Sequence, residues 1–176
     1  MNRTYIALAA LTSALVMSAA QASDGTINFT GQLTAQTCTT KVNNTSNVGT
    51  VTLPTFSIAS LATAGATVGA TNFTINLSAC TGTIATTAAI FEAGSGVDPT
   101  TQNIRNTGSA TGVQLQLLDS AGKVIKAGDT SQVANTARTT MTGTTSTLPY
   151  AVQYIATTAT TAGTVLGSVT YSINYQ

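Results

Sequence analysis

The sequence predicts an all-β protein folded as a β-sandwich, and three observations support this prediction. Apolar and polar residues alternate in several segments, as in half-buried antiparallel strands. Clusters of glycine, proline, aspartate and serine separate these segments and are typical of turns. Threonine, whose branched Cβ suits a pleated backbone, occurs throughout the chain. Seven or more short strands joined by turns favour a sandwich.

The N-terminal 22 residues predict an export signal. Arg3 supplies a positive charge, residues 5–17 are mostly apolar, and Ala20 and Ala22 form the small-x-small pattern of a signal-peptidase site. The apolar run is too short for a comfortable membrane span. We therefore expect residues 1–22 to be removed, with a buried N-terminal helix as the alternative.

The two cysteines are expected to form a disulfide bond. An exported chain folds in an oxidising compartment, where two thiols pair. Joining Cys38 to Cys80 closes a loop of about 43 residues, which stabilises the fold by roughly 4 kcal/mol in the chain-entropy model. Two free buried thiols are the alternative.

Strands are predicted along the whole mature chain. Strict alternation of apolar and polar residues occurs at 27–33, 73–77, 113–117 and 169–175. Further strands are expected at 48–53, 84–92 and 150–155. Turns are expected at 94–99, 119–122 and 142–144, and loops at 57–70 and 157–163. No change of composition marks a second folded domain.

Composition and charge argue against several function classes. Six basic and five acidic residues leave almost no net charge, which is unlike a nucleic-acid-binding protein. The absence of histidine removes the usual general base and the commonest metal ligand. Glu92 and Asp98 are a candidate acid–base pair for glycoside hydrolysis, but Asp98-Pro99 indicates a solvated turn. We expect no catalytic residue, no metal, no nucleic acid and no small-molecule cofactor.

Four sequence blocks, taken in order, resemble one known family. They are residues 24–33 with 35–38, residues 73–80, residues 112–119 with Gly122, and residues 150–154 with 163–164 and a last strand ending at 173–176. Behind an export signal and with this cysteine pair, they resemble the type 1 fimbrial pilins of the chaperone–usher pathway.

The resemblance implies an incomplete immunoglobulin-like sandwich whose final strand is supplied in trans. It assigns residues 23–33 as an N-terminal donor strand and residues 34–176 as the pilin domain. The donor's inward side chains are then Gly25, Ile27, Phe29, Gly31 and Leu33. Contacts with a periplasmic chaperone, and the border of the acceptor groove, fall to Val169, Tyr171, Ile173 and Tyr175.

The family's function is then expected here as well. The protein is expected to be a structural pilin that polymerises by donor-strand exchange, with other pilin subunits, the chaperone and an outer-membrane usher as partners. Export through the periplasm places the product in an extracellular surface fimbria that supports adhesion.

Other interpretations stay open from the residues alone. Residues 25–33 also suit the first strand of a self-contained sandwich, and the four C-terminal apolar residues also suit an ordinary core. A single-domain secreted carbohydrate-binding adhesin is the alternative function, and a hydrolase using Glu92 and Asp98 is a third. The sequence leaves open a major rod subunit or a minor one.

Overall fold

The computed structural model describes residues 26–31, 33 and 35–176. The chain divides into two units, Met1–Leu33 and Thr34–Gln176. The described residues of the first unit contain neither helix nor strand, and the second unit carries the elements described below. The expected export signal lies outside the described residues.

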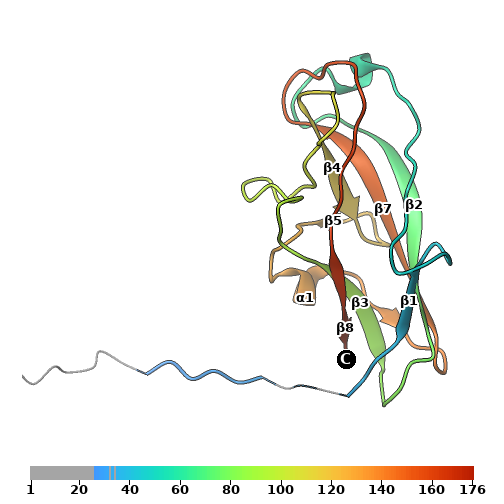
Figure 1. The fold of residues 1–176 in the computed structure, drawn as a ribbon. Coiled ribbons are helices and arrows are strands. Elements are labelled where there is room, and N and C mark those ends of the chain that lie inside the picture. Colours follow the sequence, from blue (N-terminus) through green and yellow to red (C-terminus); the bar gives the residue numbers. More distant parts are fainter. Residues whose placement is uncertain (1–25, 32, 34) are drawn as a thin grey trace, which may run out of the picture. The chain divides into compact units, whose positions relative to one another are not determined.

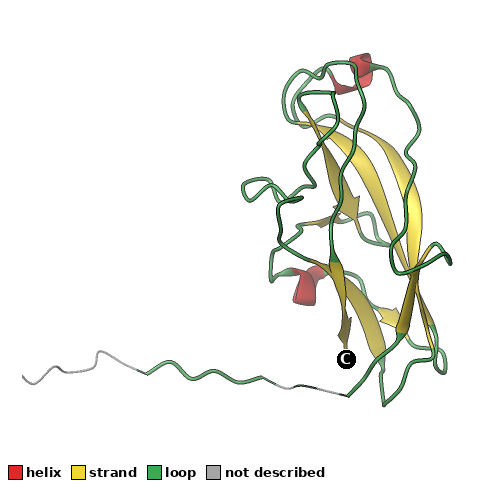
Figure 2. Ribbon diagram, viewed as in Figure 1, coloured by secondary structure: helices red, strands yellow, loops and turns green. Residues whose placement is uncertain are grey.

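The larger of two β-sheets in the second unit has five strands (Figures 1 and 2). Its order is β1-β2-β7-β4-β5, and each neighbouring pair is antiparallel. The strands are β1 (Thr39–Val42), β2 (Thr67–Ser78), β7 (Ser146–Ala156), β4 (Val113–Leu118) and β5 (Val124–Ile125). Strands β2 and β7 are the two longest strands of this sheet and pair with each other.

The smaller sheet has three strands in the order β6-β3-β8. These are β6 (Thr139–Thr140), β3 (Thr86–Phe91) and β8 (Tyr171–Tyr175), again antiparallel. Two four-residue helices complete the unit, η1 (Ile58–Leu61) and α1 (Gln132–Asn135). Two antiparallel sheets with so little helix confirm the predicted all-β class.

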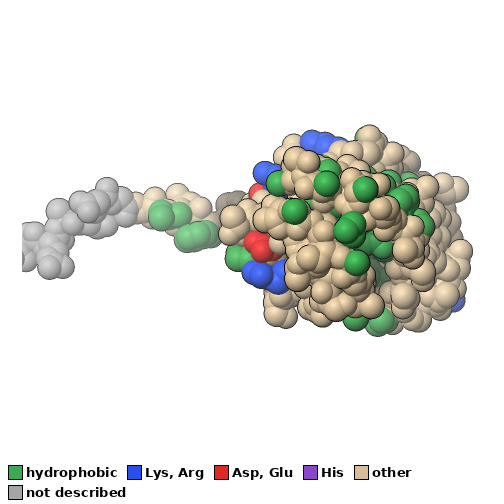
Figure 3. Space-filling view, turned by 90° about the horizontal axis from the view of Figure 1, so that it is seen from above, with side chains coloured by type: hydrophobic (Ala, Val, Ile, Leu, Met, Phe, Trp, Pro, Cys, Tyr) green, Lys and Arg blue, Asp and Glu red, His purple; other side chains and the backbone are tan. Residues whose placement is uncertain are grey.

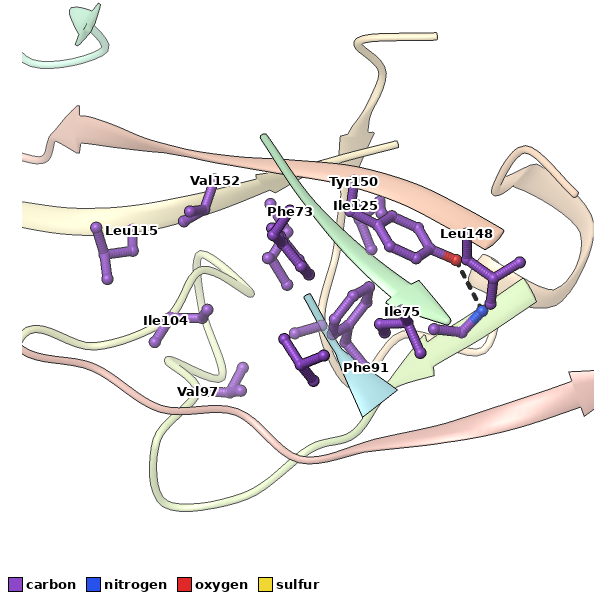
Figure 4. Close-up of a cluster of buried hydrophobic side chains, with 14 of the residues drawn as sticks. Phe73, Ile75, Phe91, Val97, Ile104, Leu115, Ile125, Leu148, Tyr150 and Val152 are labelled. Carbon is purple, nitrogen blue, oxygen red and sulfur yellow. Dashed lines mark hydrogen bonds between the residues drawn. The ribbon is translucent and has the colours of Figure 1, made fainter. Parts of the chain in front are cut away.

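The core lies between the sheets, where alternate side chains point inward (Figure 4). Its aromatic centre is Tyr150 of β7, which packs against Phe91 at 5.2 Å and Phe73 at 5.8 Å between ring centroids. The phenolic oxygen of Tyr150 accepts a hydrogen bond of 2.7 Å from the Ala89 backbone N–H. Tyr150 therefore links the two sheets through both its ring and its hydroxyl.

Most of the predicted strands are confirmed, with altered ends. The segments predicted at 73–77, 113–117, 84–92 and 150–155 correspond to β2, β4, β3 and β7. The last strand, predicted from Val169, begins at Tyr171. The predicted turn at 119–122 closes through the Gly122 N–H, which donates to the Asp119 carbonyl at 2.9 Å.

Three predictions on local structure are wrong. The described residues between 27 and 33 contain no strand. Residues 48–53 form no strand, because the chain turns at Asn43 and Asn44, both with positive φ, and then runs without a neighbouring strand. Residues 57–70 are not all loop, since they contain η1 and the first residues of β2. That early part of β2 pairs with β7, and a register shift after Val68 accommodates Gly69 at φ 76°.

Replacing Tyr150 by phenylalanine is expected to destabilise the protein by about 1–3 kcal/mol, because the buried Ala89 N–H loses its acceptor. Tyr154→Phe is the control, since its hydroxyl donates to the Pro54 carbonyl at an exposed position. Denaturant unfolding of the purified variants measures both effects. Equal losses in the two variants would contradict the assigned role.

Stability is also expected to fall at alkaline pH. Burial raises the pKa of Tyr150, although the Ala89 N–H partly offsets this. A pKa higher in the folded than in the unfolded state gives stability that is complete below the unfolded value, about 10. That stability is lost as the pH rises toward the folded value. Unfolding free energies measured across this range should fall less steeply for Tyr150→Phe than for the wild type.

Candidate functional site

A disulfide bond marks one end of the folded unit. Cys38 and Cys80 are joined, with their Cα atoms 4.1 Å apart and 42 positions apart in sequence. Cys38 directly precedes β1 and Cys80 closely follows β2, so the bond reinforces the pairing of Thr39 with Ser78. The predicted disulfide is confirmed.

The C-terminal segment presents a row of half-buried apolar side chains. Four of its odd-numbered residues pack half-buried against the core, namely Val165, Val169, Tyr171 and Ile173. Tyr175 is also half-buried and continues the same alternation. Gly167 also belongs to this row, because a Cβ atom added there would lie 2.8 Å from Cγ2 of Ile104. The core is therefore incompletely closed along this segment.

The outer edge of β8 has no neighbouring strand among the described residues. On its inner side, Gln176 and Thr86 exchange backbone hydrogen bonds of 2.9 and 2.7 Å, and the Glu92 N–H donates to the Thr170 carbonyl at 2.9 Å. Antiparallel pairing alternates, so the even-numbered backbone groups face β3. The N–H and C=O groups of the three odd-numbered residues of β8 consequently point outward, away from β3.

The opposite edge of the same sheet is covered by side chains where β6 ends. The Gln132 amide accepts from the Phe91 N–H and donates to the Phe91 carbonyl, both at 2.9 Å, as a paired strand does. On the same edge of β3, the Ala89 N–H donates to the Tyr150 hydroxyl oxygen. Side chains thus supply partners for Phe91 and for the Ala89 N–H on this edge of β3, whereas the described residues place no strand along the outer side of β8.

Residues 47–56 lie across from the open side of β8. They contain no strand, and Val51 and Leu53 rest half-buried on the core. The Tyr171 hydroxyl donates to the Asn47 carbonyl at 3.2 Å, so this segment flanks β8 (Figure 1). We call the outer side of β8, with Val51, Leu53 and the C-terminal row, the open edge.

Electrostatics at the open edge are mild. Burial raises the pKa of Tyr175, and a hydrogen bond with the Cys38 backbone partly counters it. Burial likewise raises the pKa of Tyr154, whose ring centroid lies 6.4 Å from that of Phe56. Figure 3 views the molecule from above and shows hydrophobic side chains at that end of the second unit. None of the residues that define the open edge carries a charge, so this edge suits an apolar, uncharged partner.

The expected donor residues lie in the first unit. Ile27, Phe29 and Leu33 expose 78%, 89% and 100% of their surface, Gly31 is exposed, and Gly25 is outside the described residues. Three large apolar side chains on one side of an extended segment are therefore left exposed to solvent.

The candidate acid pair has a structural explanation for one of its members. The Asp98 carboxylate accepts from the backbone N–H groups of Thr100 and Thr101 at 2.9 and 3.2 Å, which lower its pKa. Arg105 lies 3.5 Å from its other oxygen. A carboxylate held ionised by a turn is a poor general acid. In the part of the chain that the structure describes, no three potential metal ligands are grouped.

The sequence matches a family described as "Type-1 fimbrial protein, A" over residues 53–176. It is 42% identical to the F17 fimbrial protein of Escherichia coli over 166 residues, covering 90% of this chain and 91% of that one. It is 44% identical to the major fimbrial subunit SMF-1 of Stenotrophomonas maltophilia over 165 residues, covering 89% and 95%. The chain belongs to the type-1 fimbrial protein family.

Solved structures agree with this membership at the level of the fold. The P pilus rod subunit PapA matches with a TM-score of 0.60 and 16% identity, covering 78% of this chain and 99% of that one. A chaperone–usher pilus matches at 0.58 and 16%, covering 88% and 96%. The fold is the immunoglobulin-like pilin fold, and the protein is a fimbrial subunit that polymerises into an extracellular fimbria. This family and fold are those of structural subunits.

No helix among the described residues is long and apolar enough to cross a membrane.

Several residues at the site escaped the sequence analysis. Val165 continues the alternation of the predicted last strand across Gly167, so the same period extended by two steps finds it. Val51 and Leu53 were assigned to a strand that does not form. Gln132 carries no pattern that signals its bonds to β3, because those depend on how the chain crosses the sheet.

Removing the disulfide by replacing Cys38 and Cys80 with serine is expected to lower the free energy of unfolding by about 4 kcal/mol. Denaturant unfolding of this pilin with and without reductant measures the loss. Reductant should destabilise the wild type by a similar amount and leave the double variant unchanged. A double variant as stable as the oxidised wild type would refute the assignment.

Proposed function

We propose that subunits of this fimbria are joined by donor-strand exchange. Residues 23–33 of one subunit add as a strand along the open edge of the next. The observation that carries the proposal is the outer side of β8, where outward backbone groups lie beside a half-exposed core. An added strand pairs such groups and covers such a core in one step.

The N-terminal extension has the pattern that this edge requires. Ile27, Phe29 and Leu33 fall on one side of an extended chain, together with Gly25 and Gly31. Covering each of the three large side chains contributes about 1.5–3 kcal/mol. The two glycines have no side chain, so they suit positions where the acceptor lies close to the backbone of the donor.

The lengths of the two partners are also compatible. At about 3.3 Å per residue, an extended chain from Gly25 to Leu33 spans roughly 26 Å. The row from Val165 to Tyr175 spans roughly 33 Å on the same measure. The row is therefore long enough to accommodate all five alternate donor positions.

The same edge needs cover before assembly, and we propose a periplasmic chaperone for that role. Its contacts would be Val169, Tyr171, Ile173 and Tyr175, which keep the open edge from pairing indiscriminately. An outer-membrane usher would then exchange chaperone for donor, after residues 1–22 have directed export. In this proposal the protein acts by binding alone and catalyses no reaction.

Phe29→Asp is expected to abolish fibres, because the carboxylate must enter an apolar site with no cationic partner among the half-buried side chains of the open edge. Asn28→Asp is the matched control: it introduces the same charge on the side that faces away, and should leave fibres near wild-type number. Electron microscopy of cells producing each variant measures fibre number. Normal fibres from Phe29→Asp, or equal loss from both variants, would count against donor-strand exchange.

A further inference from the structure

Arg138 makes an unusual set of contacts with β3 and β8. It lies between α1 and β6, and its guanidinium makes four hydrogen bonds to only two residues. Nε donates to Thr86 Oγ1 at 2.8 Å and Nη1 to Asn174 Oδ1 at 2.8 Å. Nη2 donates to the backbone carbonyls of Thr86 and Asn174, both at 3.1 Å. One side chain thus connects β3 to β8.

The charge of Arg138 is not used for an ion pair within the described residues. Burial lowers its pKa, and its four partners are neutral oxygens. Placing a guanidinium there costs solvation that four directed bonds must offset. Arg105 differs, since it pairs with Asp98 and its side chain is 44% exposed. Arg138 therefore acts through its hydrogen-bonding geometry.

The strand that Arg138 holds has little other support. Strand β8 is five residues long and has β3 as its one neighbouring strand among the described residues. A short strand that is paired on one side only has few hydrogen bonds and opens locally more readily than a central strand. Asn174 is the last but one residue of β8, so the four-bond contact of Arg138, which we call the clamp, acts near the end of this strand.

The segment that carries Arg138 is itself fixed to the sheet. Gln132 is bonded to Phe91, the Ala137 N–H donates to Asp119 Oδ2 at 3.1 Å, and Thr139 pairs with Thr87. Arg138 is thus held on both sides by contacts that do not involve β8. The two hydrogen bonds from Arg138 to Asn174 therefore attach β8 to a segment that is itself held in place.

We propose that Arg138 is a positioning residue that keeps β8 in register with β3 while the outer side of β8 is empty. An incoming donor then meets a formed edge and does not have to order it. This inference rests on the proposed donor-strand exchange. Once a donor lies on β8, the strand has neighbours on both sides, and Arg138 matters less.

Arg138→Met, which keeps an unbranched apolar stem and removes all four hydrogen bonds, tests the proposal. The mature chain at low concentration is mixed with a fluorescent synthetic peptide of residues 23–33, and anisotropy follows the uptake. We expect peptide uptake at least about tenfold slower than in the wild type. The variant loses hydrogen bonds from a charged donor, which are stronger than neutral ones, so β8 is less often formed when the peptide arrives. Arg105→Met is the matched control, with the same loss of charge, and should behave like the wild type.

Hydrogen exchange separates positioning from general stability. In Arg138→Met, fragments covering residues 163–176 should exchange faster, while those covering 146–156 stay unchanged. Bound peptide should restore protection at 163–176 to near the wild-type level. Faster exchange in both regions would assign Arg138 a global role and overturn the inference.

The remaining outcomes are also decisive. No uptake by the wild type contradicts the proposed function itself. Uptake by the wild type with normal uptake by Arg138→Met overturns only the role of Arg138. Arg138→Lys keeps the charge without the planar fork, so it should resemble Arg138→Met. Full recovery with lysine would assign the effect to charge and refute the clamp.

Discussion

An unpaired backbone edge beside an unfinished core is the constraint on which this structure depends. Peptide N–H and C=O groups need partners, and apolar side chains need cover. Within the part of the chain that the structure describes, both needs are unmet at the same residues of β8, since Tyr171, Ile173 and Tyr175 have outward backbone groups and half-buried side chains. One extended segment with apolar residues at every second position answers both needs. A globular ligand or an amphipathic helix answers only the second.

The rest of the fold holds this edge in place with few charges. Hydroxyl groups fasten the segment that leads into β8: Thr111 binds Thr161 through backbone and side chain at 2.9 Å, and Ser109 binds Thr164 at 3.0 and 2.9 Å. Arg138 fastens the other end. The abundance of threonine thus has a use beyond strand propensity, because short hydroxyl side chains join neighbouring loops without introducing net charge.

The sequence predicted the strands in which apolar and polar residues alternate clearly, such as β2, β4 and β8, and it predicted a strand at 48–53 where no neighbouring strand exists. It missed the short strands β1, β5 and β6, because two to four residues carry too little pattern. Residues 48–53 have the composition of a strand, but strand formation needs a partner, and the described residues offer none beside Val51 and Leu53. The open edge has the same origin. Alternation shows which side chains of β8 face inward, whereas the absence of an adjacent strand is a property of topology. It was predicted through resemblance to a family, and spacing alone did not reveal it.

The residues of the open edge suit both its empty and its filled state. Long apolar edges pair readily with other chains, so an exported subunit needs an edge that tolerates water for a time. Tyrosine meets this requirement better than phenylalanine, since its ring packs on the core while its hydroxyl stays hydrated or bonded. The Tyr171 hydroxyl reaches the Asn47 carbonyl, and that of Tyr175 lies by the Cys38 backbone. These polar tips moderate the edge without pairing its backbone, so the demand for a strand remains until one arrives.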